Sequence, residues 1–135
     1  MSLDVAAVMT EAGDLLKAIS GLRVFDYEAP TVSGVTAIVG YPDEITYNQQ
    51  YGPEGFRFDL PIVLVAPNPT DRRTRDVLSR YVATSGDDSV KAAIESPADY
   101  TSMDYATVKS VTFDEVTINN VQYAGALFVV DIAGS

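Results

Sequence analysis

The sequence of 135 residues contains no cysteine and no histidine. These two absences exclude disulfide bonds, thiolate and imidazole metal sites, and the Ser-His-Asp and Cys-His catalytic arrangements. A general acid or base would have to be an Asp, Glu, Lys or Tyr side chain with a shifted pKa, which is less common. We therefore expect a protein that is not an enzyme and that binds no metal or cofactor.

Long apolar runs are also missing, since none approaches the roughly 20 residues needed to cross a bilayer. The first residues lack the basic region and the apolar stretch of a signal peptide, so the chain is expected to fold where it is made. The lack of cysteine fits a reducing cytosol, and no membrane partner is expected.

Positive charge is scarce, with 9 Lys and Arg residues against 19 Asp and Glu residues and a net charge of −10. Contacts from Lys and Arg to phosphates dominate affinity for nucleic acids, so this chain is a poor general binder of nucleic acid. Its acidity has two interpretations. It keeps the protein soluble, which charge alone favours, or it lines a channel through which DNA slides without sticking.

Hydrophobic residues make up 47% and charged residues 21% of the chain, which is typical of a globular protein. No internal repeat or linker divides it, so one domain over residues 1–135 is predicted. Apolar residues at three- and four-residue spacing predict an amphipathic helix over 4–20, capped by Ser2 or Asp4. The further helices expected are one capped by Thr70 or Asp71 and ending near Thr84, and a short one over 89–95 capped by Asp87 or Asp88.

Residues that favour β-structure predict strands over 22–27, 34–40, 56–66, 107–118 and 121–133, with a loop over 43–55. Asn119-Asn120 suits a two-residue hairpin turn because Asn tolerates positive φ. Pro61 cannot donate to a ladder, which predicts a bulge or an edge position, and a jump in apolar phase predicts a bulge near Asp114-Glu115. The order indicates an α+β fold: a mainly antiparallel sheet with an N-terminal helix and two further helices on one face, and a closing β-hairpin.

Three features favour contacts with other subunits. Arg72, Arg73, Arg75 and Arg80 cluster on or before the second helix, near a positive dipole end, so they either stay solvated or pair with carboxylates of a neighbouring copy. The loop 43–55 places aromatic and amide side chains, including Tyr47, Gln49, Gln50 and Tyr51, at a surface suited to interaction. The last strand is apolar on both faces, so either helices cover both or another subunit covers one, and we expect Phe128 and Val130 at such an interface.

Acidic pairs offer a weaker, catalytic interpretation. Asp26 with Glu28, or Asp43 with Glu44, would serve acid–base chemistry if their pKa values diverged. Such pairs are abundant in a chain this acidic, so the signal is slight. Asp43-Glu44 and Asp87-Asp88 also lack the alternating ligands and glycine of a calcium loop, and they are better explained as turn and cap residues.

The whole pattern resembles the tail terminator (tail-completion or minor tail) proteins of long-tailed bacteriophages with non-contractile tails. The likeness covers most of residues 3–133 and is most specific from Leu78 to Ile94. The segments that carry it are Gly21–Val24, Pro61–Val65, Asp76–Tyr81, Ser85–Ile94 and Val121–Tyr123.

The resemblance implies an α+β subunit that assembles with copies of itself, typically as a homohexameric ring, on the head-proximal end of the tail tube in the virion. Such a ring is assembled in the host cytoplasm, stops polymerisation of the tube protein and joins the tail to the head-completion proteins of the neck. DNA passes through its lumen only as cargo, and no catalysis or cofactor is implied. Related neck proteins share this layout, so a head-closure or adaptor protein is the alternative.

Overall fold

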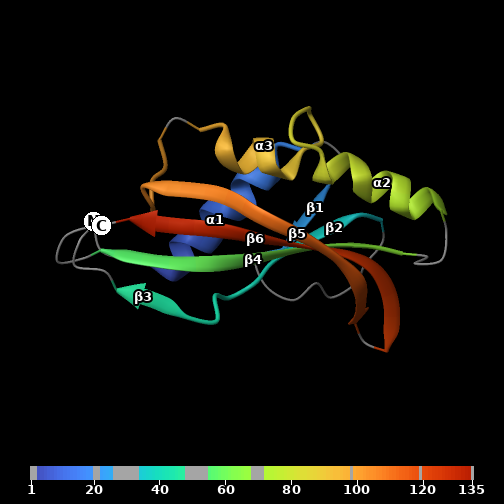
Figure 1. Ribbon diagram of the computed structural model, residues 1–135, viewed down its shortest axis with the longest axis horizontal. Coiled ribbons are helices and arrows are strands. Elements are labelled where there is room, and N and C mark those ends of the chain that lie inside the picture. Colours follow the sequence, from blue (N-terminus) through green and yellow to red (C-terminus); the bar gives the residue numbers. More distant parts are fainter. Residues whose placement is uncertain are drawn as a thin grey trace.

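The computed structural model describes residues 3–19, 22–25, 34–47, 55–67, 72–97, 99–118 and 120–134. Three helices pack on one face of a six-stranded sheet, so the α+β class predicted from the sequence is confirmed (Figure 1). Along the chain the elements are α1 (Val5–Leu16), β1 (Arg23–Phe25), β2 (Thr36–Val39), β3 (Ile45–Tyr47), β4 (Phe56–Ala66), α2 (Arg72–Val82), α3 (Val90–Glu95), β5 (Tyr105–Ile118) and β6 (Val121–Gly134).

The sheet has the order β1-β2-β4-β6-β5, and β3 also pairs with β4. Every pairing is antiparallel except that of β1 with β2. The long strand β4 is central because β6 pairs with its whole length, from Phe56 opposite Gly134 to Ala66 opposite Ala124. Its other edge is shared by β2 and β3.

The core lies between this sheet and the helices. Side chains alternate along β4, and Phe58, Leu60 and Ile62 all point into the core, where they are buried. From the helices, Leu16 of α1 and Ile94 of α3 meet them in the same apolar cluster. Fully burying a side chain of this kind contributes about 1.5–3 kcal/mol, so the alternation determines which face of the sheet the helices cover.

The caps of the helices are partly those expected. Asp4 caps α1, and its Oδ1 accepts a hydrogen bond from the backbone N–H of Ala7 at 3.1 Å. Ser89, and not Asp87 or Asp88, caps α3, and its Oγ accepts from the N–H of Ala92 at 3.1 Å. The Ser89 hydroxyl also donates to the carbonyl oxygen of Ala83, just beyond α2. The short serine side chain thus links the end of α2 to the start of α3 at a closer distance than an exposed carboxylate would allow. The residues expected to cap α2 lie outside the described part of the chain.

The region predicted as a loop over 43–55 contains a short strand. β3 pairs with Phe56–Phe58 of β4, where β2 has already ended at Val39 and has left that edge of β4 open. A strand of three residues is too short to show a clear alternation of apolar and polar side chains, so it was not predicted from the sequence. Residues 48–54 of the same loop lie outside the described residues.

Pro61 lies inside β4 without a register shift, so the bulge predicted there is absent. Its carbonyl oxygen accepts a hydrogen bond from Gly40 N–H at 2.9 Å, on the side of β4 that faces β2 and β3. The nitrogen of a strand residue points to the same side as its carbonyl, so the missing N–H faces the gap between the end of β2 and the start of β3. The position is locally edge-like, which is how a central strand tolerates proline.

β5 and β6 form the predicted hairpin, with Ile118 opposite Val121 and with Asn120 at a φ of +66°. Asn119 lies outside the described residues. The register shift falls between Val108 and Ser110 and not near Asp114-Glu115. Farther along β5 the strand is regular, and its apolar residues switch from one face of the sheet to the other. This end of the hairpin extends beyond the main body of the sheet (Figure 1), so no core requires the apolar side chains to stay on one face.

Candidate assembly surfaces

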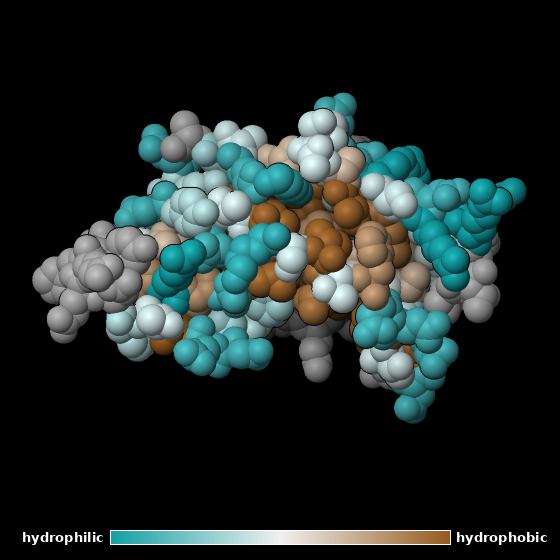
Figure 2. Space-filling model, viewed as in Figure 1, coloured by the Kyte–Doolittle hydropathy of each residue, from teal (hydrophilic) through white to brown (hydrophobic). Residues whose placement is uncertain are grey.

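The face of the sheet opposite the helices, the open face, is apolar at its centre. The side chains that alternate with the core residues of three neighbouring strands meet there, and all are half-buried except Leu127, which is 37% exposed. Figure 2 shows a hydrophobic centre on this side of the molecule, surrounded by hydrophilic side chains. An antiparallel sheet with one face in water normally carries polar side chains there, so this surface is unusual for an isolated subunit. Its apolar residues are Ile38, Pro61, Val63, Leu127 and Val129.

A network of four charges borders this apolar centre. Asp59 of β4 lies directly opposite Asp131 of β6, a pairing of like charges that is destabilising by itself. Arg57 compensates Asp131 with two hydrogen bonds, from Nε to Oδ1 at 3.0 Å and from Nη2 to Oδ2 at 2.5 Å. Lys109 Nζ lies 3.2 Å from Asp59 Oδ1. The network is therefore neutral overall, and it involves β4, β6 and β5.

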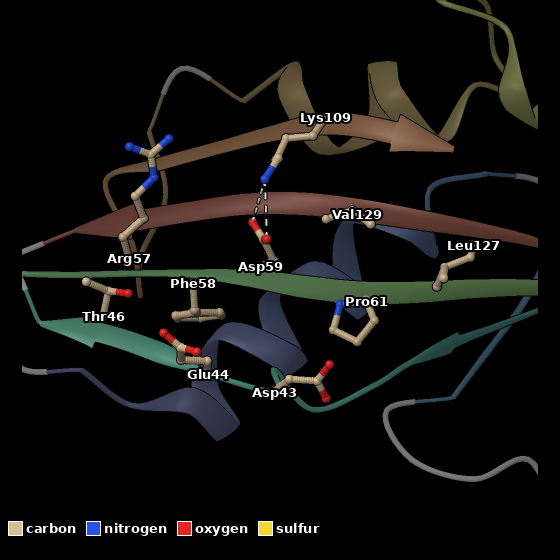
Figure 3. A pocket seen from close by; sticks show the side chains of 10 residues that line it. All are labelled: Asp43, Glu44, Thr46, Arg57, Phe58, Asp59, Pro61, Lys109, Leu127 and Val129. Atoms are coloured by element: carbon tan, nitrogen blue, oxygen red, sulfur yellow. Dashed lines mark hydrogen bonds and ion pairs between the residues drawn. The ribbon is translucent and has the colours of Figure 1, made fainter. Parts of the chain in front are cut away.

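Lys109 reaches this network from the bulge in β5. The register shift between Val108 and Ser110 makes Lys109 the extra residue, and its side chain extends over the open face to Asp59 (Figure 3). After the shift, Val111 pairs with Phe128 and faces the core again. Lys109 and Ser110 thus lie between two core-facing residues, and β-bulges are frequent next to functional sites.

Arg57, Asp59 and Lys109 of this network, together with part of the apolar centre, line a hollow of about 580 Å³. Asp43 and Glu44, in the segment before β3, stand at its edge, and we call these two residues the acidic rim (Figure 3). Neither makes a hydrogen bond or ion pair with another residue that the structure describes. The hollow thus has carboxylates at its edge and apolar surface on its floor, from Pro61, Leu127 and Val129.

The four arginines predicted as an interface all lie on α2, and all are exposed. Thr74, Leu78 and Tyr81 are buried on the opposite side of the helix. We call the exposed side, with Arg72, Arg73, Arg75 and Arg80, the arginine face. Asp76 is the single acidic residue on α2, and it is exposed as well.

Three residues of the arginine face differ from four other basic residues in their partners. Lys17, Arg57, Lys91 and Lys109 each form an ion pair with a carboxylate. Arg72, Arg75 and Arg80 form none with any residue of the described ranges, although the chain carries a large excess of acids. Arg72 lies at the start of α2, where positive charge opposes the helix dipole, whereas Arg80 lies in the last turn, where positive charge is favourable.

Phe128 and Val130 do not lie where an interface was expected. Both are buried in the core, on the helix-covered face of β6. The side chains that β6 presents on the open face are Leu127 and Val129. Phe128 is larger and so drew attention in the sequence, but its size suits the core, and the alternation of β6 would have identified its neighbours.

Tyr47 lies in β3 with 76% of its surface exposed, as an interaction residue would. Gln49, Gln50 and Tyr51 lie outside the described residues, so the role of the loop stays a prediction. A second hollow of about 630 Å³ separates α2 from the β5–β6 hairpin. Phe113, 57% exposed, lines it together with Arg75, Asp114 and Glu115, and sequence reasoning did not single out this aromatic residue.

The carboxyl groups with shifted pKa values tie helices to neighbouring segments. Burial would raise the pKa of Glu11, but hydrogen bonds from Ser102 and Thr101 outweigh it and lower that pKa. Burial would likewise raise the pKa of Glu95, and hydrogen bonds from Lys91 and the N–H of Val108 lower it. Both carboxylates thus have structural partners, and neither lines the two hollows.

Within the described ranges, no three acidic side chains gather closely enough to hold a metal ion. None of the helices described is both long and apolar enough to cross a membrane. No protein-family model matches the chain, and no curated protein shows significant sequence similarity to it.

Proposed function

We propose that this protein is a structural virion subunit that forms a six-membered ring at the head-proximal end of a phage tail tube. The ring stops polymerisation of the tube and joins the tail to the head-completion proteins. The apolar open face carries the proposal, because three helices cover only one side of the sheet and a neighbouring subunit would cover the other. The sequence resemblance to tail terminators supplies the identity of the assembly.

The charge of the chain is consistent with this role. A ring of subunits that each carry −10 is strongly acidic overall, and an acidic lumen would repel the phosphates of passing DNA. Four of the nine basic residues belong to the arginine face, which leaves the rest of the surface strongly acidic. DNA would then be cargo and not a ligand.

The test is assembly with the tube protein encoded in the same genome. Sedimentation velocity should show a discrete hexamer, alone or once tube protein is added, and electron microscopy should show a ring at one end of tubes of limited length. Monomer in both conditions, with unrestricted tube growth, would refute the proposal. Binding to filled heads but not to tubes would instead identify a head-closure or adaptor protein.

A further inference from the structure

Two oppositely charged surfaces of this molecule cannot meet within one copy. In the view of Figure 1, α2 with its arginine face lies above β4 at one end of the molecule, whereas the segment before β3, which holds the acidic rim, lies below β4 and nearer the middle. Arg72 and Arg80 have no carboxylate partner among the described residues, and neither Asp43 nor Glu44 has a basic one. Each surface therefore offers what the other lacks.

We propose that the arginine face of one copy docks in the rimmed hollow of the next copy, so that subunits associate head to tail. The inference rests on the proposed ring and names the surfaces that close it. Contact between two different surfaces is heterologous, and it generates a closed ring when the rotation per subunit divides a full turn. The occupant of the open face is thus a second copy of this chain.

The chemistry of arginine suits both parts of the hollow. A guanidinium group presents a planar fork of donors that matches a carboxylate, so it pairs with Asp43 or Glu44. Its methylene stem meanwhile covers apolar surface, here that of Pro61 and Leu127 on the floor of the hollow. One kind of side chain thereby satisfies the acidic rim and the apolar centre together.

DNA is the other ligand that an arginine face could take. The net charge of −10 opposes it, because the rest of the surface repels phosphates over the distance at which DNA approaches. The acidic rim carries the opposite charge and belongs to a surface that also needs apolar cover. A second copy is therefore the better partner, and DNA binding becomes an outcome of the test.

Two charge-reversed variants test the contact. The helix variant carries Arg72→Glu and Arg80→Glu, and the rim variant carries Asp43→Arg and Glu44→Arg. Each alone should assemble at least about tenfold more weakly than the wild type, because like charges then face each other. An equimolar mixture should assemble again, since every contact in an alternating ring joins opposite charges. A chain with all four substitutions should also assemble.

Lys17→Glu and Asp99→Arg serve as controls, because both side chains are exposed and lie outside the two surfaces. They should assemble as the wild type does, and all variants should keep its thermal unfolding midpoint. If the wild type forms rings and both charge-reversed variants do so equally well, the head-to-tail contact is wrong while the proposed function stands. If the wild type stays monomeric even with tube protein, both fail. Loss of DNA binding in the helix variant with unchanged assembly would assign the arginines to DNA.

Discussion

Asp131 is the one buried carboxylate among the acidic residues that the structure describes, and its nearest cross-strand neighbour is another aspartate. The side chain of Asp131 is 6% exposed, whereas that of Arg57 is 52% exposed. The pair therefore lies at the boundary between core and solvent. Its two hydrogen bonds replace the water that Asp131 loses on folding, and removing the arginine would leave a desolvated charge beside Asp59.

Arg57→Ala is expected to lower the free energy of unfolding by about 2 kcal/mol, less than for a fully buried pair because half of the arginine is in solvent. Lys109→Ala removes the exposed partner of Asp59 and should cost less than about 1 kcal/mol. Urea unfolding of both variants measures the difference. The double variant Arg57→Ala/Asp131→Ala should regain part of the loss, and equal costs for Arg57→Ala and Lys109→Ala would contradict this account.

At the scale of elements, two carboxylates join segments that are distant in the sequence. Glu11 of α1 accepts hydrogen bonds from the N–H groups of Thr101 and Ser102, both at 2.8 Å, and from the Ser102 hydroxyl at 2.6 Å. Glu95 of α3 accepts from the N–H of Val108 at 2.9 Å, beside the bulge in β5. Polar contacts thus attach α1 to the segment before β5 and α3 to β5 itself, in addition to the contacts of the core.

Glu11→Gln is expected to cost about 1–3 kcal/mol at neutral pH, because one amide oxygen replaces two charged acceptors. The pKa of Glu11 is lowered from 4.5 in the fold, so its contribution is complete above that value and is lost as the pH falls through the folded pKa. The stability gap between wild type and variant should therefore narrow below about pH 4.5. Thermal unfolding across pH 3–7 tests this, and a gap independent of pH would refute it.

Whether an element can be predicted from the sequence depends on which interactions determine its position in the fold. β4 lies at the predicted residues, and α1 lies within the predicted range 4–20 but ends at Leu16; each has one face against the core, which imposes a period of 2 or 3.6. β3 forms only because β4 has a free edge there, which is a property of the folded sheet. The bulge at Lys109 was missed for the same reason, because it is defined by the pairing of β5 with β6 in the folded sheet.

The candidate surfaces were predicted to different degrees. The cluster of arginines was visible in the sequence. That Arg72 and Arg80 have no carboxylate partner among the described residues was not, because pairing depends on which strands and helices become neighbours. The apolar character of both faces of β6 was also visible. Choosing Leu127 and Val129 over Phe128 and Val130 required knowing which face the helices cover. The hollow itself arises from strands that the topology brings together.

For the whole molecule, the placement of the arginine face and the acidic rim on separate surfaces makes head-to-tail assembly sensitive to salt. The screening length falls from about 10 Å at 0.1 M ionic strength to about 3 Å at 1 M. Assembly through the arginine face and the acidic rim should therefore weaken as NaCl is raised over this range, as measured by sedimentation velocity. The variant with all four substitutions should respond in the same way. Assembly that strengthens with salt would indicate a contact that is apolar alone.

The two faces of the sheet are also under different selective pressures. Leu60 and Ile62 pack against the helices of their own chain, so substitutions there are constrained only by the stability of the fold. Substitutions at Val63 or Leu127 are constrained by the partner that packs on the open face. Under head-to-tail docking, this partner is α2 of another copy of the same protein. Among homologous sequences, substitutions on the open face should then covary with substitutions on the exposed side of α2.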